Sequence, residues 1–237
     1  MKKCIFLFIV VSFIIGGCAT TSLKQDYPTG KRYRDVFVLE DKRIPLPEGE
    51  WKIVGTRTTD MGKYSEVFLL KETNNHKFAG GVIIVSDTIM NNYVGYIQNT
   101  YAERKDHHYV SIKSNTRTER LDLWLVNHYI FSFTPGQRDA SKEFLQYLID
   151  NKISVPKLMV RSYHIITGKM LRSRYLRVEY YYNPEIEGFD LSREDNWGTS
   201  SWHIMKIASD PKKVAYVENV KKQGEIFHGK IREWFQY

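Results

Sequence analysis

The sequence predicts an α+β domain with a mostly antiparallel sheet, a mid-chain helix and a C-terminal amphipathic helix packed against that sheet. Three observations lead to this fold class. Strand-like segments follow one another with turn signals between them. Apolar residues recur at helical spacing after Pro135-Gly136 and again after Asp210-Pro211. The order of these strands and helices fits an α+β domain.

The first half of the folded chain has the pattern of an antiparallel meander. The expected strands are 36–39, 51–54, 65–71 and 78–85, with a bend over 44–50 and a loop over 72–76. The last two of these strands flank a short polar loop and predict a hairpin. Residues 88–103 carry apolar side chains at helical spacing, which predicts a helix, although their tyrosines and asparagines would also suit a strand.

The second half adds a strand covered on both faces, a hairpin and the two helices. The expected elements are strand 121–133, a helix after Asp139, hairpin strands 158–166 and 171–182, loop 183–196, a short strand 202–207 and a helix from Asp210-Pro211. The later hairpin strand alternates apolar residues with Arg177 and Glu179, which predicts one solvent-exposed face. Gly224 is expected to break or kink the last helix.

Composition and charge bound the class of protein. The chain has 237 residues, 42% hydrophobic and 26% charged, which is close to the average for globular proteins. Its formal charge is +8, and its basic residues are scattered along the sequence, so no nucleic-acid footprint is indicated. A lysine-rich solvated surface and a surface that lies against anionic lipid both remain open.

The amino terminus has the three-part pattern of an export signal. Met1-Lys2-Lys3 is cationic, residues 4–15 are almost entirely apolar, and Gly16-Gly17 are small. The apolar run is shorter than the roughly 20 residues that span a bilayer as a helix, which favours cleavage over a retained anchor. The only cysteines are Cys4, inside this leader, and Cys18, at its end. The expected exported domain therefore has no disulfide.

Ile15-Gly16-Gly17-Cys18 resembles the lipobox of bacterial lipoproteins, although Ile15 stands where leucine is most frequent. The resemblance implies cleavage between Gly17 and Cys18. It also implies diacylglycerol on the Cys18 thiol and often a third acyl chain, such as palmitate, on its nitrogen. Two or more chains anchor a protein stably in a membrane. An ordinary secretory leader with an incidental cysteine is the alternative.

The lipobox sets the expected domain organisation and location. We expect a signal peptide over 1–17, a lipid-anchored flexible tether over 18–34 and one globular domain over 35–237. In lipoproteins of two-membrane bacteria, aspartate after the cysteine usually signals retention at the inner membrane. Ala19 stands there in this chain, so the resemblance favours the outer membrane if the organism has two membranes.

Residues 198–203 are the most suggestive cluster for catalysis. A hydrolase would use Ser200 or Ser201 with His203 or His128, and a carboxylate such as Asp190 or Asp195 would have to arrive from the neighbouring loop. There is no Gly-x-Ser-x-Gly elbow to present the serine, so a structural turn is the favoured interpretation of this cluster.

Aromatic residues offer a second candidate site. Tyr181, Trp197 and Trp202, with Tyr180 and Tyr182, fall near one predicted loop and are candidates for the rim of a ligand cleft. The alternative is that these rings seal one edge of the core.

Two further patterns do not complete a site. Asp106-His107-His108 has ligand types for zinc but no partner at metal-binding spacing, and Thr167-Gly168-Lys169-Met170 lacks the rest of a phosphate loop. We therefore predict no metal and no cofactor.

Two classes of function remain. One is a membrane-anchored envelope lipoprotein that acts as a binding or scaffold module for an envelope protein or polymer, with no nucleic-acid partner. The other is an envelope hydrolase with a Ser/His site near Ser201 and His203.

Overall fold

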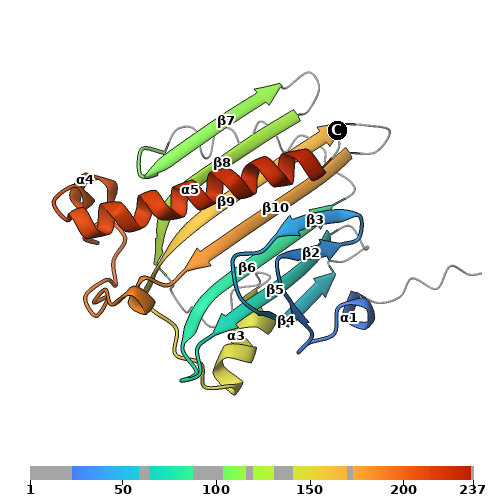
Figure 1. Ribbon diagram of the computed structural model, residues 1–237, viewed down its shortest axis with the longest axis horizontal. Coiled ribbons are helices and arrows are strands. Elements are labelled where there is room, and N and C mark those ends of the chain that lie inside the picture. Colours follow the sequence, from blue (N-terminus) through green and yellow to red (C-terminus); the bar gives the residue numbers. More distant parts are fainter. Residues whose placement is uncertain are drawn as a thin grey trace, which may run out of the picture.

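The computed structural model describes residues 23–58, 64–87, 104–115, 120–130, 141–169 and 173–235. These ranges contain a large antiparallel sheet, a separate two-stranded hairpin and helices on both faces of the large sheet (Figure 1). The predicted α+β class, with a mostly antiparallel sheet and a C-terminal helix packed on it, is confirmed. The expected helix at 88–103 and the capping residue Asp139 lie outside the described residues.

Eight strands form the large sheet. Their spatial order is β1 (Arg32–Tyr33), β4 (Trp51–Thr58), β5 (Tyr64–Glu72), β6 (Phe78–Asp87), β10 (Ser173–Tyr182), β9 (Leu158–Lys169), β8 (Arg120–Ile130) and β7 (Tyr109–Asn115). All neighbours are antiparallel. The sheet thus joins two meanders through the pairing of β6 with β10, in which Ile84 lies opposite Val178. Both predicted hairpins are confirmed, as β5–β6 and β9–β10.

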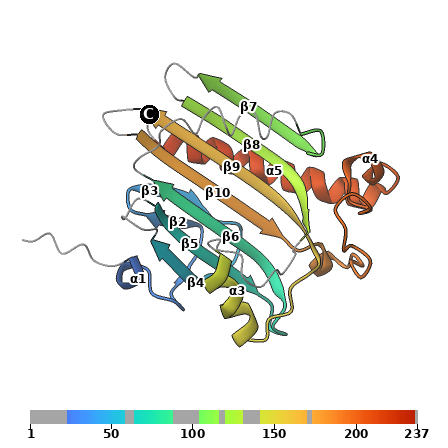
Figure 2. The same ribbon diagram turned by 180° about the vertical axis from the view of Figure 1, so that it is seen from behind.

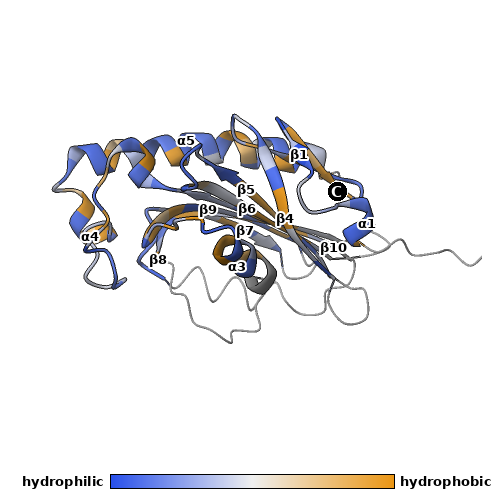
Figure 3. Cartoon of the chain, turned by 90° about the horizontal axis from the view of Figure 1, so that it is seen from below, coloured by the Kyte–Doolittle hydropathy of each residue, from blue (hydrophilic) through white to orange (hydrophobic). Residues whose placement is uncertain are grey.

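The two faces of the sheet have different covers (Figures 2 and 3). The long helix α5 (Pro211–Trp234) and the hairpin of β2 (Val36–Leu39) and β3 (Lys42–Pro45) pack on one face, and α3 (Ser141–Asp150) lies on the other. Because side chains alternate along a strand, neighbouring residues serve different cores. Val178 and Tyr180 of β10 join the core under α5, whereas Tyr181 joins the core under α3.

Strand β8 shows this division most clearly. Leu123 and Leu125 are buried on the α3 face, and Trp124 and Val126 are buried on the α5 face. The prediction that this strand is covered on both sides is confirmed. The strand is not central in the sheet, however, because only β7 lies beyond it.

Helix α5 begins where the sequence predicts. The Asp210 side chain accepts hydrogen bonds from the backbone N–H groups of Lys212 and Lys213, and Pro211 occupies the first turn. The expected break at Gly224 is absent, and the helix continues through it to Trp234. A β-carbon at Gly224 would lie 2.5 Å from Ser162 Oγ, so glycine lets α5 approach β9 closely.

Two local predictions are wrong. Residues 202–207 do not form a strand. Ile204–Ile207 forms the short helix α4 instead, and the His203 ring caps it by accepting from the backbone N–H of Met205. The face of β10 that carries Arg177 and Glu179 is not solvated. Glu179 is 6% exposed, because ion-pair partners on its own face compensate its burial.

The folded domain includes residues before the predicted boundary at residue 35. Leu23–Asp26 forms α1, and Arg32–Tyr33 forms β1, which pairs with β4. Leu23, Tyr27 and Tyr33 pack against the core under α5. The polar composition of residues 18–34 predicts a flexible tether over the whole segment. Residues 23–33 of that segment are instead part of the folded domain.

Candidate functional site

The predicted hydroxyls of Ser200 and Ser201 have different environments. Ser200 is buried, and its Oγ accepts a hydrogen bond from the backbone N–H of Trp202 at 3.0 Å. Ser201 is half-buried, donates its hydroxyl to Glu194 Oε1 and accepts from the Lys213 ammonium. Ser201 therefore has both a carboxylate and an ammonium at its hydroxyl.

Glu194 supplies the carboxylate in place of the predicted aspartates. Its Oε2 also accepts from the backbone N–H of Ser201 at 3.1 Å. Burial alone would raise the pKa of the Glu194 carboxyl, but hydrogen bonds from Ser201 and Ser200 and the nearby Lys213 charge outweigh burial and lower that pKa. Asp190 instead accepts from the backbone N–H of Ser192 at 2.9 Å. Asp195 is exposed.

An open cleft adjoins this serine at the junction of α4 and α5. Its volume is about 930 Å³. Its lining mixes polar with apolar side chains and consists of Thr199, Ser201, Met205, Lys206, Ala208, Ser209, Asp210, Pro211 and Lys213. Met205 is 82% exposed and is the most exposed large apolar side chain among the described residues. The cleft can therefore contact both apolar and charged groups of a ligand.

The structure does bring the predicted histidines together, but around Trp197. The His128 ring stacks on Trp197 with ring centroids 5.2 Å apart, and the His203 and His108 rings each lie 5.8 Å from the His128 ring. Burial first, and then the neighbouring histidine charges, lower the pKa of His108 to about 4. Burial lowers the pKa of His128 to about 4 as well. Both imidazoles are therefore neutral near pH 7. Within the described residues neither ring forms a hydrogen bond with a serine hydroxyl, and His128 Nε2 lies 3.4 Å from the backbone oxygen of Trp197 instead.

The aromatic residues expected at one cleft are separated. Trp202 is fully buried and packs edge-to-face on Tyr216 and Phe189. Tyr181 lies on the opposite face of the sheet, in the core under α3. Trp197 alone is half-buried in the loop beside the histidines. Tyr180 and Tyr182 are core residues as well, so most of these rings seal the core.

A buried ion-pair network on the α3 face was not predicted. Glu179 lies 3.0 Å from Arg161 and 3.2 Å from Arg177, and it accepts a hydrogen bond of 2.6 Å from the Tyr181 hydroxyl. Burial alone would raise the pKa of the Glu179 carboxyl, but the two guanidinium groups outweigh it and lower that pKa. The sequence signal for this network is the alternation of Arg177 and Glu179 with apolar residues. A solvent-exposed strand face has the same pattern, so the signal does not identify buried ion pairs.

A second unpredicted chain of polar groups lies under α5. Ser162 Oγ is 2.8 Å from His164 Nε2, His164 Nδ1 is 3.2 Å from His228 Nδ1, and His228 Nε2 is 2.5 Å from Asp122 Oδ1. These are the residue types of nucleophilic catalysis. Ser162 is fully buried beneath Gly224, so no substrate reaches its hydroxyl. The sequence signal for this chain of polar groups is His228, which lies on the buried face of the last helix.

Comparisons with known proteins do not assign this chain to a family. No protein-family description, curated protein or solved structure matches this chain significantly. Across the described ranges, no group of three or more His, Cys, Asp or Glu side chains is placed to hold a metal ion. None of the helices formed by residues 23–235, where these are described, is long and apolar enough to cross a membrane. Gly17 and Cys18 lie outside the described residues.

Proposed function

We propose that this chain is a lipid-anchored protein of the bacterial cell envelope, whose domain binds a ligand and does not cleave it. The observation that carries the anchoring is the position of Cys18 in a lipobox-like sequence directly after an export leader. Ala19 after that cysteine favours the outer membrane of an organism with two membranes.

The position of α1 in the sequence supports an anchoring role. Leu23, where α1 begins, is five residues after Cys18. A fully extended chain of that length reaches about 18 Å. An acylated Cys18 would therefore keep the domain close to the membrane surface, which makes the tether much shorter than the 17 residues expected over 18–34.

The position of the α4 cleft supports a binding role. Figures 1 and 2 show α1 at one end of the molecule and α4 at the other. With the α1 end held at a membrane, the cleft beside Met205 and Lys206 would project away from it. We propose that this end contacts an envelope protein or polymer, for which exposed apolar and cationic side chains provide contacts.

Intact mass spectrometry of the membrane fraction tests the anchor. The expected result is a protein that begins at Cys18 and carries acyl mass, and a Cys18→Ala variant that loses both the acyl mass and the membrane association. Cys4→Ala is the matched control, because Cys4 lies within the leader and should leave processing unchanged. An uncut leader, or a free Cys18 thiol in the wild-type protein, would contradict the proposal.

A hydrolase is the second candidate, and the contact of Ser201 with Lys213 is the observation that favours it. Serine–lysine pairs occur in hydrolases, where a neutral lysine removes the hydroxyl proton. Here the Ser201 hydroxyl donates to Glu194 and accepts from the Lys213 ammonium, which also lies 3.8 Å from Asp210 Oδ2. This charge arrangement favours binding over catalysis.

A fluorophosphonate probe separates the two candidates, because it labels activated serine nucleophiles. We expect no labelling of the wild-type protein above that of Ser201→Ala. Ser200→Ala is the matched control for an adjacent hydroxyl. Labelling that requires Ser201 and Lys213 would overturn the binding proposal in favour of the hydrolase.

A further inference from the structure

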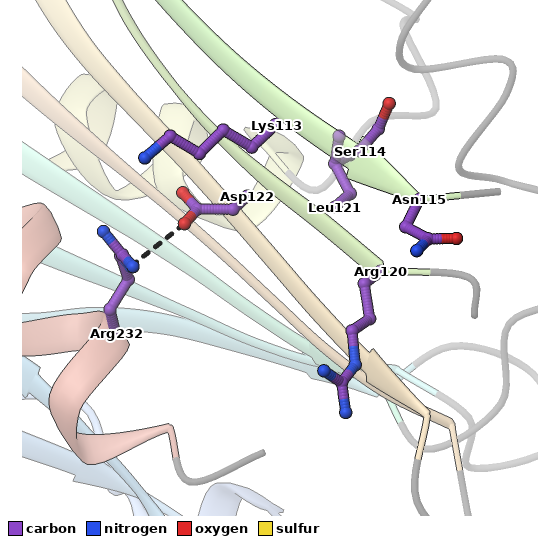
Figure 4. Close-up of a pocket in the computed structure, with 7 residues that line it drawn as sticks. All are labelled: Lys113, Ser114, Asn115, Arg120, Leu121, Asp122 and Arg232. Carbon is purple, nitrogen blue, oxygen red and sulfur yellow. Dashed lines mark ion pairs between the residues drawn. The ribbon is translucent and has the colours of Figure 1, made fainter. Parts of the chain in front are cut away.

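A small pocket lies between the β7–β8 hairpin and the last turns of α5. Its volume is about 290 Å³. It is lined by Lys113, Ser114, Asn115, Arg120, Leu121, Asp122 and Arg232 (Figure 4). Lys113 lies opposite Asp122 in the strand register, and Asn115 lies opposite Arg120, so these four side chains share the face that α5 covers. This pocket is separate from the α4 cleft, which lies at the other end of α5.

Cationic side chains dominate this pocket. It contains three of them, Lys113, Arg120 and Arg232, against one carboxylate, Asp122. The net charge of the lining is therefore two positive units. A cavity with walls of one sign concentrates ligands of the opposite charge.

The Asp122 carboxylate is held on both sides, by His228 and by Arg232. Asp122 Oδ1 contacts the buried His228 ring at 2.5 Å, and Oδ2 is 2.9 Å from Arg232 Nε. Burial alone would raise the pKa of Asp122, but these partners outweigh it and lower that pKa, so Asp122 is ionised at neutral pH. Since His228 fixes Asp122 from behind, Asp122 in turn positions the Arg232 guanidinium at the pocket wall.

The remaining donors point to a ligand with several acceptor oxygens. Arg232 uses Nε for Asp122, and its two terminal nitrogens form no ion pair or hydrogen bond within the described part of the chain. The Lys113 ammonium likewise forms none there. Figure 4 shows Lys113 and Arg232 approaching Asp122 from two sides, while the Arg120 side chain extends along another wall. Guanidinium groups match the oxygens of phosphate in geometry and charge.

We propose that this pocket binds a phosphate group. The Lys113 ammonium and the terminal nitrogens of Arg232 supply positive charge and hydrogen-bond donors for a phosphate, and the volume of about 290 Å³ is at the lower end of small-molecule sites. The pocket therefore suits one phosphate-bearing headgroup or small molecule and not an extended polymer.

Two sources supply this chemistry, a soluble phosphate compound and a phospholipid headgroup. The carboxyl end of α5, from which Arg232 comes, lies at the same end of the molecule as α1, as the two opposite views in Figures 1 and 2 show. If Cys18 is acylated as proposed, this is the end nearer the membrane. Phosphate binding itself does not depend on acylation, so a failure of one proposal would be distinguishable from a failure of the other.

Calorimetric titration with inorganic phosphate tests the site on the full chain in neutral detergent micelles. We expect saturable binding. Lys113→Gln/Arg232→Gln should weaken the affinity by about tenfold or more, because two charge-assisted contacts are lost. Lys77→Gln/Lys222→Gln is the matched control, since it removes the same charge at exposed positions outside the pocket and should leave the affinity unchanged.

Micelles that also contain phosphatidylglycerol distinguish the two sources. If a lipid headgroup occupies the pocket, phosphatidylglycerol will weaken the apparent affinity for inorganic phosphate in the wild-type protein. If the ligand is soluble, the affinity will be the same in both kinds of micelle. The proposal is overturned if inorganic phosphate does not bind in neutral micelles, or if the pocket variant binds as tightly as the wild type. Equal losses in the pocket variant and its control would also overturn it.

Discussion

Arg161 Nη1 lies 3.0 Å from Glu179 Oε2 across the β9–β10 pair, on the sheet face that carries α3. Both side chains are largely buried. Their cost of desolvation is offset by further contacts, since Arg161 also donates to Asn127 at 3.1 Å and Tyr181 donates to Glu179. Removing one member would leave the others buried without their partner.

Glu179→Gln should therefore lower the free energy of unfolding by about 3–5 kcal/mol, the usual cost of breaking a buried ion pair. Urea denaturation followed by circular dichroism measures this change. Glu50→Gln is the control, because Glu50 pairs with Arg32 and Arg34 at the surface and should show no measurable effect. If both variants had the same stability, the buried network would contribute nothing beyond a surface pair.

The two α5 glycines should respond to alanine with opposite signs. A β-carbon at Gly224 would meet Ser162 Oγ at 2.5 Å and the Trp124 ring at 3.1 Å. Gly224→Ala should therefore destabilise the protein by about 1–3 kcal/mol through overpacking. At Gly229 nothing lies within 4 Å of the added atom. Gly229→Ala should stabilise the protein by about 0.4–1 kcal/mol, because alanine loses less backbone entropy in a helix.

Thermal unfolding of the two glycine variants and the wild type measures whether stability decreases in Gly224→Ala and increases in Gly229→Ala. Because both positions are in the same helix, helix propensity is the same for each and only the contact with β9 differs. A Gly224→Ala protein that is as stable as Gly229→Ala would mean that α5 does not approach Ser162 as closely as described.

Much of the fold followed from sequence because its signals are local. Alternating apolar residues located β5, β6, β8, β9 and β10, and Asp210-Pro211 located the start of α5 to the residue. The failures depended on long-range contacts. The alternation along β10 predicts that Glu179 is exposed to solvent. Its burial depends on ion pairs, one of them with Arg161 of the neighbouring strand β9. Residues 23–33 are mostly polar, and they join the domain through pairing with β4 and through the packing of Tyr27 and Tyr33 on Phe37.

The sites were less predictable than the fold for the same reason. Ser201 and His203 are neighbours in sequence, yet the Ser201 hydroxyl contacts Glu194 and Lys213, and the His203 ring contacts His128 and Trp197. Proximity along the chain thus gave the wrong partners. The phosphate pocket combines β7, β8 and α5, and its residues have no common spacing in the sequence from which a motif could be recognised.

The histidine cluster should make the protein less stable in mild acid. Burial holds the pKa of His128 at about 4, below the value of about 6.5 expected in the unfolded chain. The unfolded state therefore binds more protons than the folded state between these two values, and stability falls as the pH falls through this window. For His128, which is almost fully buried, the free energy of unfolding falls by about 3 kcal/mol across this pH window.

Urea denaturation at a series of pH values from about 7 to about 4 measures this dependence. Carboxylates with lowered pKa values, such as Glu194 and Asp106, also lose their contribution in acid, so the wild-type curve alone does not isolate the histidine. His128→Gln removes one of the titrating rings and should make the slope shallower between about pH 6.5 and about pH 4, whereas His108, whose pKa is also about 4, still contributes. His76→Gln is the control for the substitution itself, because the His76 side chain is exposed on the β5–β6 loop. An unchanged slope in His128→Gln would show that His128 is accessible to protons in the folded state.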